Sequence, residues 1–158
     1  MNHLRVSEMD WIEQRSPLGK FHVFRRHLSE ALGAPRDAGV ANGGHPFDVE
    51  MVKLPPGATN CPFHAHAAQW EFYLVLSGSG SIRHGDTATP VAAGDSFVCP
   101  PGEAHHLTNT GTEDLLYYVI ADNPPADVIH YPDTGKWHVK PLRKSFVMQE
   151  VDYYQGEE

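Results

Sequence analysis

Cysteine, basic side chains and long apolar runs are all scarce in this sequence, and each shortage excludes a class of protein. Two cysteines in 158 residues, Cys61 and Cys99, cannot build a disulfide framework, so we expect two free thiols. No stretch approaches the roughly 20 consecutive apolar residues of a membrane span, and the first residues lack the apolar core of a signal peptide. Both observations predict a cytoplasmic protein without a membrane partner.

The charge balance is acidic. Lys and Arg number 12 and Asp and Glu number 20, giving a formal net charge of −8 that opposes binding to nucleic acid and to anionic membranes. A hydrophobic content of 41% indicates a folded protein. A chain of 158 residues is long enough for one domain with a sizeable core. These bounds predict a single globular domain that binds no nucleic acid.

Histidine is abundant by contrast, with 11 residues, and three of them fall into two spaced motifs. The first motif is Gly57-(x6)-His64-Ala65-His66-(x4)-Glu71-(x6)-Gly78. The second motif is Gly94-(x5)-Pro100-Pro101-Gly102-(x2)-His105-(x3)-Asn109. Chance alone often produces one His-x-His pair in a chain with this many histidines, so the prediction depends on the whole set of spacings.

Strand geometry explains how these side chains can meet. Successive strand side chains point to opposite faces, so His64 and His66 share a face. Glu71 follows His66 by five residues and is out of phase, so a turn must intervene at 67–70. Three neutral imidazoles and one carboxylate suit iron, manganese, nickel, cobalt or zinc better than calcium or magnesium. An octahedral ion would keep two open positions and a tetrahedral zinc none, and the residues are compatible with both.

The two motifs resemble the conserved motifs of the cupin superfamily. The resemblance implies an all-β fold, a cupin double-stranded β-helix or jelly-roll barrel. It also implies that His64, His66, Glu71 and His105 hold one divalent transition metal, which could be iron, manganese, zinc or nickel. Asn109 would close the second motif as a structural residue. Cys61, three residues before His64, leaves a sulfur near the metal as an alternative.

Three regions are predicted along the chain. Residues 1–45 form an N-terminal extension, in which Ser16-Pro17 is typical of a helix start and apolar residues recur at helical spacing, most securely over 26–32. Residues 46–122 form the cupin barrel, and residues 123–158 a C-terminal extension that packs on the barrel or on a partner. The apolar residues at helical spacing are Phe21, Phe24, Leu28, Ala31 and Leu32.

Short strands separated by glycine turns are predicted from residue 47 onward. The predicted strands are 47–54, 61–66, 71–76, 80–84, 88–92, 95–99, 105–109 and 114–121. Arg25, Arg26 and Arg36 are predicted to lie on a solvated helix face, and residues 36–46 are predicted to form a loop.

Strand alternation also predicts which side chains reach the cavity. If Glu71 faces inward, then Tyr73 does too, which makes Tyr73 the candidate catalytic group; the alternative is a wall tyrosine bonded to backbone. Gln69 and Phe63 are predicted at the mouth of the substrate pocket, and Trp70 should point away.

Two functions fit these residues. The first is a metal-dependent enzyme that acts on a small polar organic molecule, with dioxygenase-, decarboxylase- or isomerase-like chemistry. The second is a non-catalytic protein that binds or senses a small molecule or metal. Exposed barrel edges and apolar extensions invite pairing, so a homodimer is expected.

Overall fold

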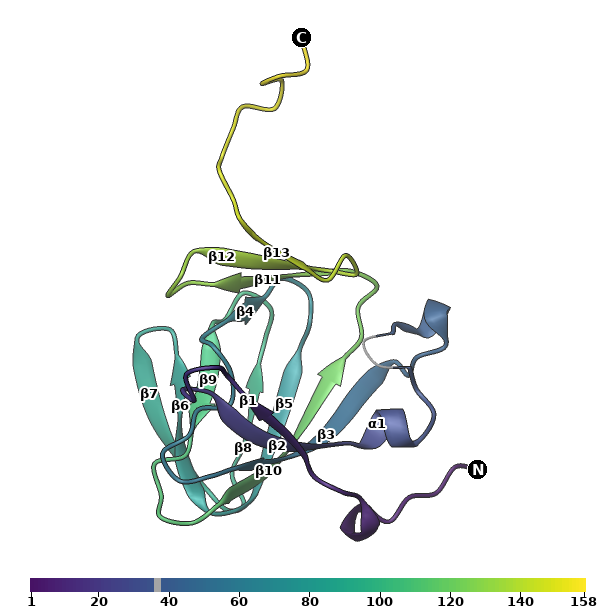
Figure 1. Ribbon diagram of the computed structural model, residues 1–158, viewed down its shortest axis with the longest axis vertical. Coiled ribbons are helices and arrows are strands. Elements are labelled where there is room, and N and C mark those ends of the chain that lie inside the picture. The colour runs from purple at the N-terminus through teal and green to yellow at the C-terminus, as the bar shows by residue number, and fades with distance from the viewer. Residues whose placement is uncertain (36–37) are drawn as a thin grey trace.

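The computed structural model describes residues 1–35 and 38–158, and these residues are mostly β-strand (Figure 1). The helical elements are the one-turn helix α1 (Leu28–Ala31) and the 3-10 turns η1 (Val6–Glu8) and η2 (Val40–Asn42). The strands are β1 (Ile12–Arg15), β2 (His22–His27), β3 (Phe47–Leu54), β4 (Ala65–His66), β5 (Glu71–Ser77), β6 (Ser79–His84), β7 (Thr87–Ala92), β8 (Ser96–Cys99), β9 (His105–Thr108), β10 (Leu115–Asp122), β11 (Asp127–Tyr131), β12 (Lys136–Lys140) and β13 (Lys144–Val147).

The strands form three sheets. A six-stranded sheet has the order β1-β2-β3-β10-β5-β8, a three-stranded sheet the order β7-β6-β9, and a four-stranded sheet the order β13-β12-β11-β4. Inward-facing side chains of the first two sheets together make one apolar core, which includes Leu54, Leu107 and Leu115, each with no exposed surface. Burying each of these leucines contributes about 1.5–3 kcal/mol. This arrangement confirms the predicted cupin fold.

Several barrel strands follow the sequence prediction closely because buried and more exposed side chains alternate along them. In β5, Tyr73 and Val75 are buried while Phe72 and Leu76 are exposed. The strand β3 coincides with the predicted range 47–54. The predicted strand 61–66 is shorter, because only Ala65 and His66 form β4.

Asn109 fixes the loop that ends the second motif, as the sequence predicts. Its side chain is fully buried, and its Nδ2 atom donates to the carbonyls of Leu54 (2.7 Å) and Glu113 (2.8 Å). Its Oδ1 atom accepts from the amide of Gly111 (2.9 Å). Gly78 packs against the same region with a φ of 80°, and a Cβ there would lie 2.5 Å from the Asp114 carbonyl oxygen. Only glycine fits this close approach.

The helical interpretation of the N-terminal extension is wrong for residues 22–27, which form β2. The helix α1 is confined to Leu28–Ala31. Pairing with β3 over four residue pairs stabilises the extended chain and overrides the helical spacing of the apolar residues. Ser16 caps no helix; its Oγ accepts from the Phe21 amide (3.0 Å) and closes the turn between β1 and β2.

The predicted solvated helix face is also wrong for Arg25, which lies on β2 and is mostly buried. Arg36, and the first two residues of the predicted loop 36–46, lie outside the described residues.

The C-terminal extension contributes three strands where none is predicted. The strand β11 pairs with β4 through Ile129 opposite His66, so the extension lies directly against the first motif. The remaining chain, residues 148–158, runs away from the barrel (yellow in Figure 1). No helix in the described part of the chain is both long and apolar enough to cross a membrane.

Candidate metal centre

The two motifs are joined by backbone hydrogen bonds as well as by contacts between their side chains. His64 and His105 lie directly opposite each other in an antiparallel bridge, with the His64 amide 3.2 Å from the His105 carbonyl and the reverse bond at 2.8 Å. His66 follows on the same face of the chain, and residues 67–70 turn as predicted so that Glu71 begins β5. The fold therefore brings all four predicted ligands to one end of the barrel.

The side-chain distances suit one metal ion. The ligand atoms of His64, His66 and Glu71 all lie within 4.8 Å of one another. Two atoms bound to one ion at about 2.0–2.2 Å are at most about 4.4 Å apart, so a small contraction closes this triad on an ion. His105 joins the group through its Nε2 atom, which lies 2.6 Å from Oε2 of Glu71.

Each of the three histidines has a hydrogen-bond acceptor at Nδ1. His64 donates to the Pro62 carbonyl (3.0 Å), and His105 to the Glu103 carbonyl (3.1 Å). His66 donates to the carboxylate of Asp127 (2.5 Å). An acceptor at Nδ1 holds a proton there, which leaves Nε2 as the nitrogen that can bind a metal. The donor set of three imidazole nitrogens and one carboxylate therefore fits a divalent transition metal.

Burial and charge set the protonation of these ligands. Burial lowers the pKa of His64 to about 4, so this imidazole stays neutral at physiological pH. Burial alone would raise the pKa of Glu71, but the hydrogen bond with His105 and the charges of the neighbouring histidines lower it to about 2. Burial alone would lower the pKa of His105, but the Cys99 thiol and the Glu71 carboxylate outweigh burial and raise it.

Tyr73 lies beside two of the candidate ligands, Glu71 and His105. Its hydroxyl donates to Oε2 of Glu71 (3.2 Å) and lies 3.5 Å from Nε2 of His105. The side chain is 3% exposed, and burial raises its pKa well above the usual value, so the phenol remains a hydrogen-bond donor.

The two predicted mouth residues separate. Gln69 lines the cavity, and its Nε2 atom donates to the Asp122 carbonyl (2.6 Å). Phe63 is not among the described residues that line the cavity. Its ring packs edge-on against His106 (5.5 Å between centroids), and the Arg83 guanidinium lies 3.6 Å from its centroid. A residue beside His64 in an irregular segment has no strand alternation to fix its direction, which explains the misplacement.

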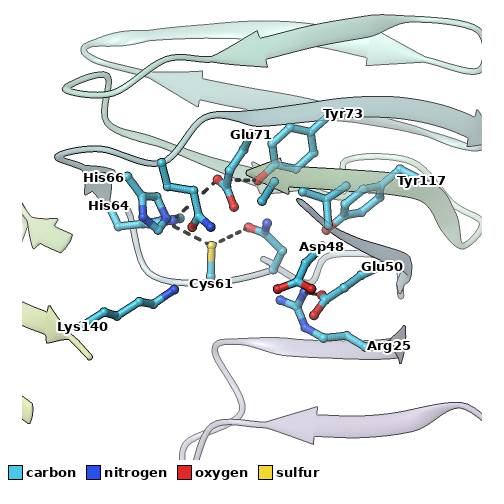
Figure 2. A pocket seen from close by; sticks show the side chains of 14 residues that line it. Arg25, Asp48, Glu50, Cys61, His64, His66, Glu71, Tyr73, Tyr117 and Lys140 are labelled. Atoms are coloured by element: carbon cyan, nitrogen blue, oxygen red, sulfur yellow. Dashed lines mark hydrogen bonds and ion pairs between the residues drawn. The ribbon is translucent and has the colours of Figure 1, made fainter. Parts of the chain in front are cut away.

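A cavity of about 210 Å³ opens from the metal ligands toward β2, β3 and β12 (Figure 2). Its far wall carries charged groups that sequence reasoning missed, because they come from strands outside both motifs. Arg25 donates to Glu50 (2.5 Å), and Glu50 also contacts Nδ1 of His27 (2.6 Å). The residues lining the cavity are Arg25, Asp48, Glu50, Asn60, Cys61, His64, His66, Gln69, Glu71, Tyr73, Tyr117, Val119, Ala121 and Lys140.

Neither thiol is arranged as a metal ligand. The sulfur of Cys61 lies 3.6 Å from Nδ1 of His64, the ring nitrogen on the side away from Nε2. Burial raises the pKa of Cys61 to about 12, which keeps it a thiol. Cys99 is free, as the sequence predicts, and it is buried in the core.

Comparison with known proteins adds the following findings. Residues 50–121 match the family described as a cupin domain. The oxalate-binding protein of Thermotoga maritima is 35% identical over 69 residues, which cover 44% of this chain and 56% of the relative. Auxin-binding protein 1 of Arabidopsis thaliana is 30% identical over 103 residues, covering 60% of this chain and 51% of the relative. The chain thus spans about half the length of these curated relatives.

A solved structure matches a larger share of this chain than the two curated relatives do. A sugar phosphate isomerase from a cupin superfamily, from Silicibacter pomeroyi, matches with a TM-score of 0.74 over 91% of this chain and 90% of that structure. The two sequences are 21% identical, so the likeness extends to the fold.

Proposed function

We propose that this chain, whose residues 50–121 match a cupin domain, is a metal-dependent protein that acts on a small polar organic molecule. The observation that carries this proposal is the convergence of three histidine Nε2 atoms and the Glu71 carboxylate at the wall of a polar cavity. We infer that His64, His66, Glu71 and His105 hold one divalent transition metal there.

The cavity supports a small polar ligand. Its volume of about 210 Å³ lies below the roughly 300–1,000 Å³ of pockets that hold drug-sized molecules. Lys140 and a bound dication would attract oxygen atoms of a ligand, and the charge of Arg25 is paired with Glu50. A small carboxylic acid is therefore the first class to test, in keeping with the oxalate-binding relative.

The residues around the centre have distinct roles in this proposal. A bound metal supplies Lewis-acid or redox chemistry to the ligand. Glu71 serves as a metal ligand, and coordination to a cation lowers the basicity of its carboxylate, which makes it a poor general base. Tyr73 is held as a neutral phenol beside Glu71, and its hydroxyl can donate to an oxygen atom of the ligand in exchange for its hydrogen bond to Glu71. Gln69 lines the same cavity with its amide anchored to the Asp122 carbonyl, and thereby shapes the wall.

A second function, binding without turnover, is favoured by the position of the other carboxylates. Asp48 and Glu50 lie across the cavity from the metal ligands (Figure 2), and Glu50 is paired with Arg25 and His27. Proton abstraction from a metal-bound ligand needs a base within hydrogen-bond reach. Chemistry centred on the metal, or binding alone, needs no such base.

Metal loading followed by a ligand screen tests the proposal. We expect about one metal per chain in protein purified without chelator or nickel resin, and loss of that metal in the His64→Ala, His105→Ala double variant. His106→Ala is the matched control, because His106 packs against Phe63 and away from the centre. Full metal occupancy in the double variant would contradict the site.

Protein loaded with Fe(II), Mn(II) or Zn(II) is then screened against small carboxylates, diketones, phenols and sugars. Turnover that requires metal supports the enzyme. Metal-dependent binding without turnover under every metal supports the binding protein. Binding that is unchanged in folded, metal-free protein would contradict both.

A further inference from the structure

We propose that Asp127 is a positioning residue of the metal centre, which holds His66 in the ring orientation and tautomer that direct Nε2 toward the metal. The C-terminal strand β11 is then a working part of the site, although it lies beyond the cupin match at 50–121. This inference depends on the proposed metal-binding function.

Both oxygens of the Asp127 carboxylate are engaged at the first motif. Oδ2 accepts from Nδ1 of His66 (2.5 Å), and Oδ1 accepts from the backbone amide of Ala68 (2.8 Å). One carboxylate therefore fixes a ligand ring and the turn that follows it. The Asp127 side chain is 2% exposed and that of His66 is 6% exposed, so water competes little for either bond.

The chemistry of the acceptor determines what His66 can do. An ionised carboxylate only accepts hydrogen bonds, so Nδ1 must carry a proton and Nε2 of a neutral ring must carry the lone pair. A carboxylate behind a ligating imidazole also raises the basicity of that imidazole. Without Asp127, the His66 ring could rotate, or carry its proton on Nε2, and both changes weaken metal binding.

His66 differs from the other two histidines in this respect. His64 and His105 donate to the backbone carbonyls of Pro62 and Glu103, which lie two residues away in the chain. His66 instead depends on a side chain 61 residues later. The orientation of the His66 ring therefore depends on the docking of the C-terminal hairpin against the first motif.

The backbone around Asp127 is held firmly enough to act as a support. The strands β11 and β4 pair through Ile129 opposite His66, and the Ala67 amide donates to the Val128 carbonyl (2.9 Å). Across the hairpin, Asp127 is paired in register with Lys140, a cavity residue. The same strand pair thus supports the metal ligand and presents a cation to the cavity.

The test compares Zn²⁺ and Mn²⁺ affinity, measured by chelator competition, in wild-type protein, Asp127→Asn and Asp127→Glu. We expect both variants to bind metal about 10–100-fold more weakly, as for other residues behind ligating histidines. Asp127→Glu keeps the charge but displaces the carboxylate, so its metal affinity still tests the proposal if Asp127→Asn fails to fold. The matched control is Asp133→Asn, which removes an exposed carboxylate of the same hairpin that is bonded to Arg83.

A second readout separates positioning from simple structural support. Nitrogen NMR of the metal-free protein should show His66 protonated on Nδ1 in wild type and a mixture of tautomers in Asp127→Asn. Folded variants that lose stability but keep wild-type metal affinity and the wild-type His66 tautomer would overturn the inference while leaving the proposed function intact. Wild-type protein that binds neither metal would overturn both.

Discussion

His105 and Glu71 show what a metal has to displace. Nε2 of His105 lies 2.6 Å from Oε2 of Glu71. An ionised carboxylate cannot donate a hydrogen bond, so in the metal-free protein Nε2 of His105 carries the proton of this bond. This nitrogen is also the one that faces the other ligands. A metal ion therefore takes the place of that proton.

The raised pKa of His105 predicts the pH dependence of metal binding. Below its raised pKa the ring is protonated, so metal binding at neutral pH must release a proton, and affinity should increase as the pH rises from 6 to 8. His64, with a pKa of about 4, contributes nothing over this range. Calorimetry in buffers of different ionisation enthalpy measures the released proton. An affinity that stays constant from pH 6 to 8 would contradict this prediction, and His106→Ala should leave the slope unchanged.

Among the elements, β2 is attached to β3 by a partly buried charged cluster. Arg25 donates to Gln14 (3.0 Å) and to Glu50 (2.5 Å), and Glu50 also contacts His27 (2.6 Å). Burial would raise the pKa of Glu50, but His27 and Arg25 lower it to about 2. The cluster ties the N-terminal extension to the barrel and forms the far wall of the cavity.

Removing the charge of Glu50 should therefore destabilise the protein. Glu50→Gln leaves the Arg25 guanidinium without its carboxylate, and breaking a partly buried pair in this way costs about 1–3 kcal/mol. Because the folded pKa of Glu50 is below its ordinary 4.5, wild-type protein gains stability from this group above pH 4.5 and loses it as the pH falls toward 2.

Urea unfolding at pH 7 and pH 3 measures both effects. The variant should lose more stability at pH 7 than at pH 3. Asp133→Asn, at an exposed pair with Arg83, should cost clearly less stability than Glu50→Gln. Equal losses for the two variants at pH 7 would contradict a structural role for the cluster.

The sequence predicts a strand well where buried and exposed side chains alternate along it. It predicts a strand poorly where pairing with a distant segment determines the secondary structure. The strands β3, β5 and β10 have regular inward and outward faces, so their ranges follow from the residues. The strand β2 is too short to distinguish the two periodicities, and its pairing with β3 decides the outcome. Asp127, Arg25 and Lys140 reach the site only through tertiary contacts, and no local motif marks them.

At the scale of the whole molecule, the outer face of the six-stranded sheet carries apolar side chains. Phe72, Val98 and Ile120 lie side by side across β5, β8 and β10, and each is more than a third exposed. Contiguous apolar surface of this kind marks interaction sites. We propose that a second copy of the chain covers it.

Light scattering at micromolar concentration should then give twice the 17.5 kDa of one chain. Phe72→Glu should shift the protein toward the monomer, because a charge in the centre of an apolar interface is costly to desolvate. Val147→Glu is the matched control, since Val147 is an exposed apolar residue on the separate strand β13. A monomeric wild-type protein would contradict the proposed pairing.

The position of Asp127 in the chain also bears on the order in which the protein is made. The ribosome synthesises His64, His66, Glu71 and His105 before it reaches the strand that orients His66. A growing chain therefore contains every metal ligand before it contains their full support. On the proposed role of Asp127, a chain that ends before β11 therefore binds metal more weakly than the full chain.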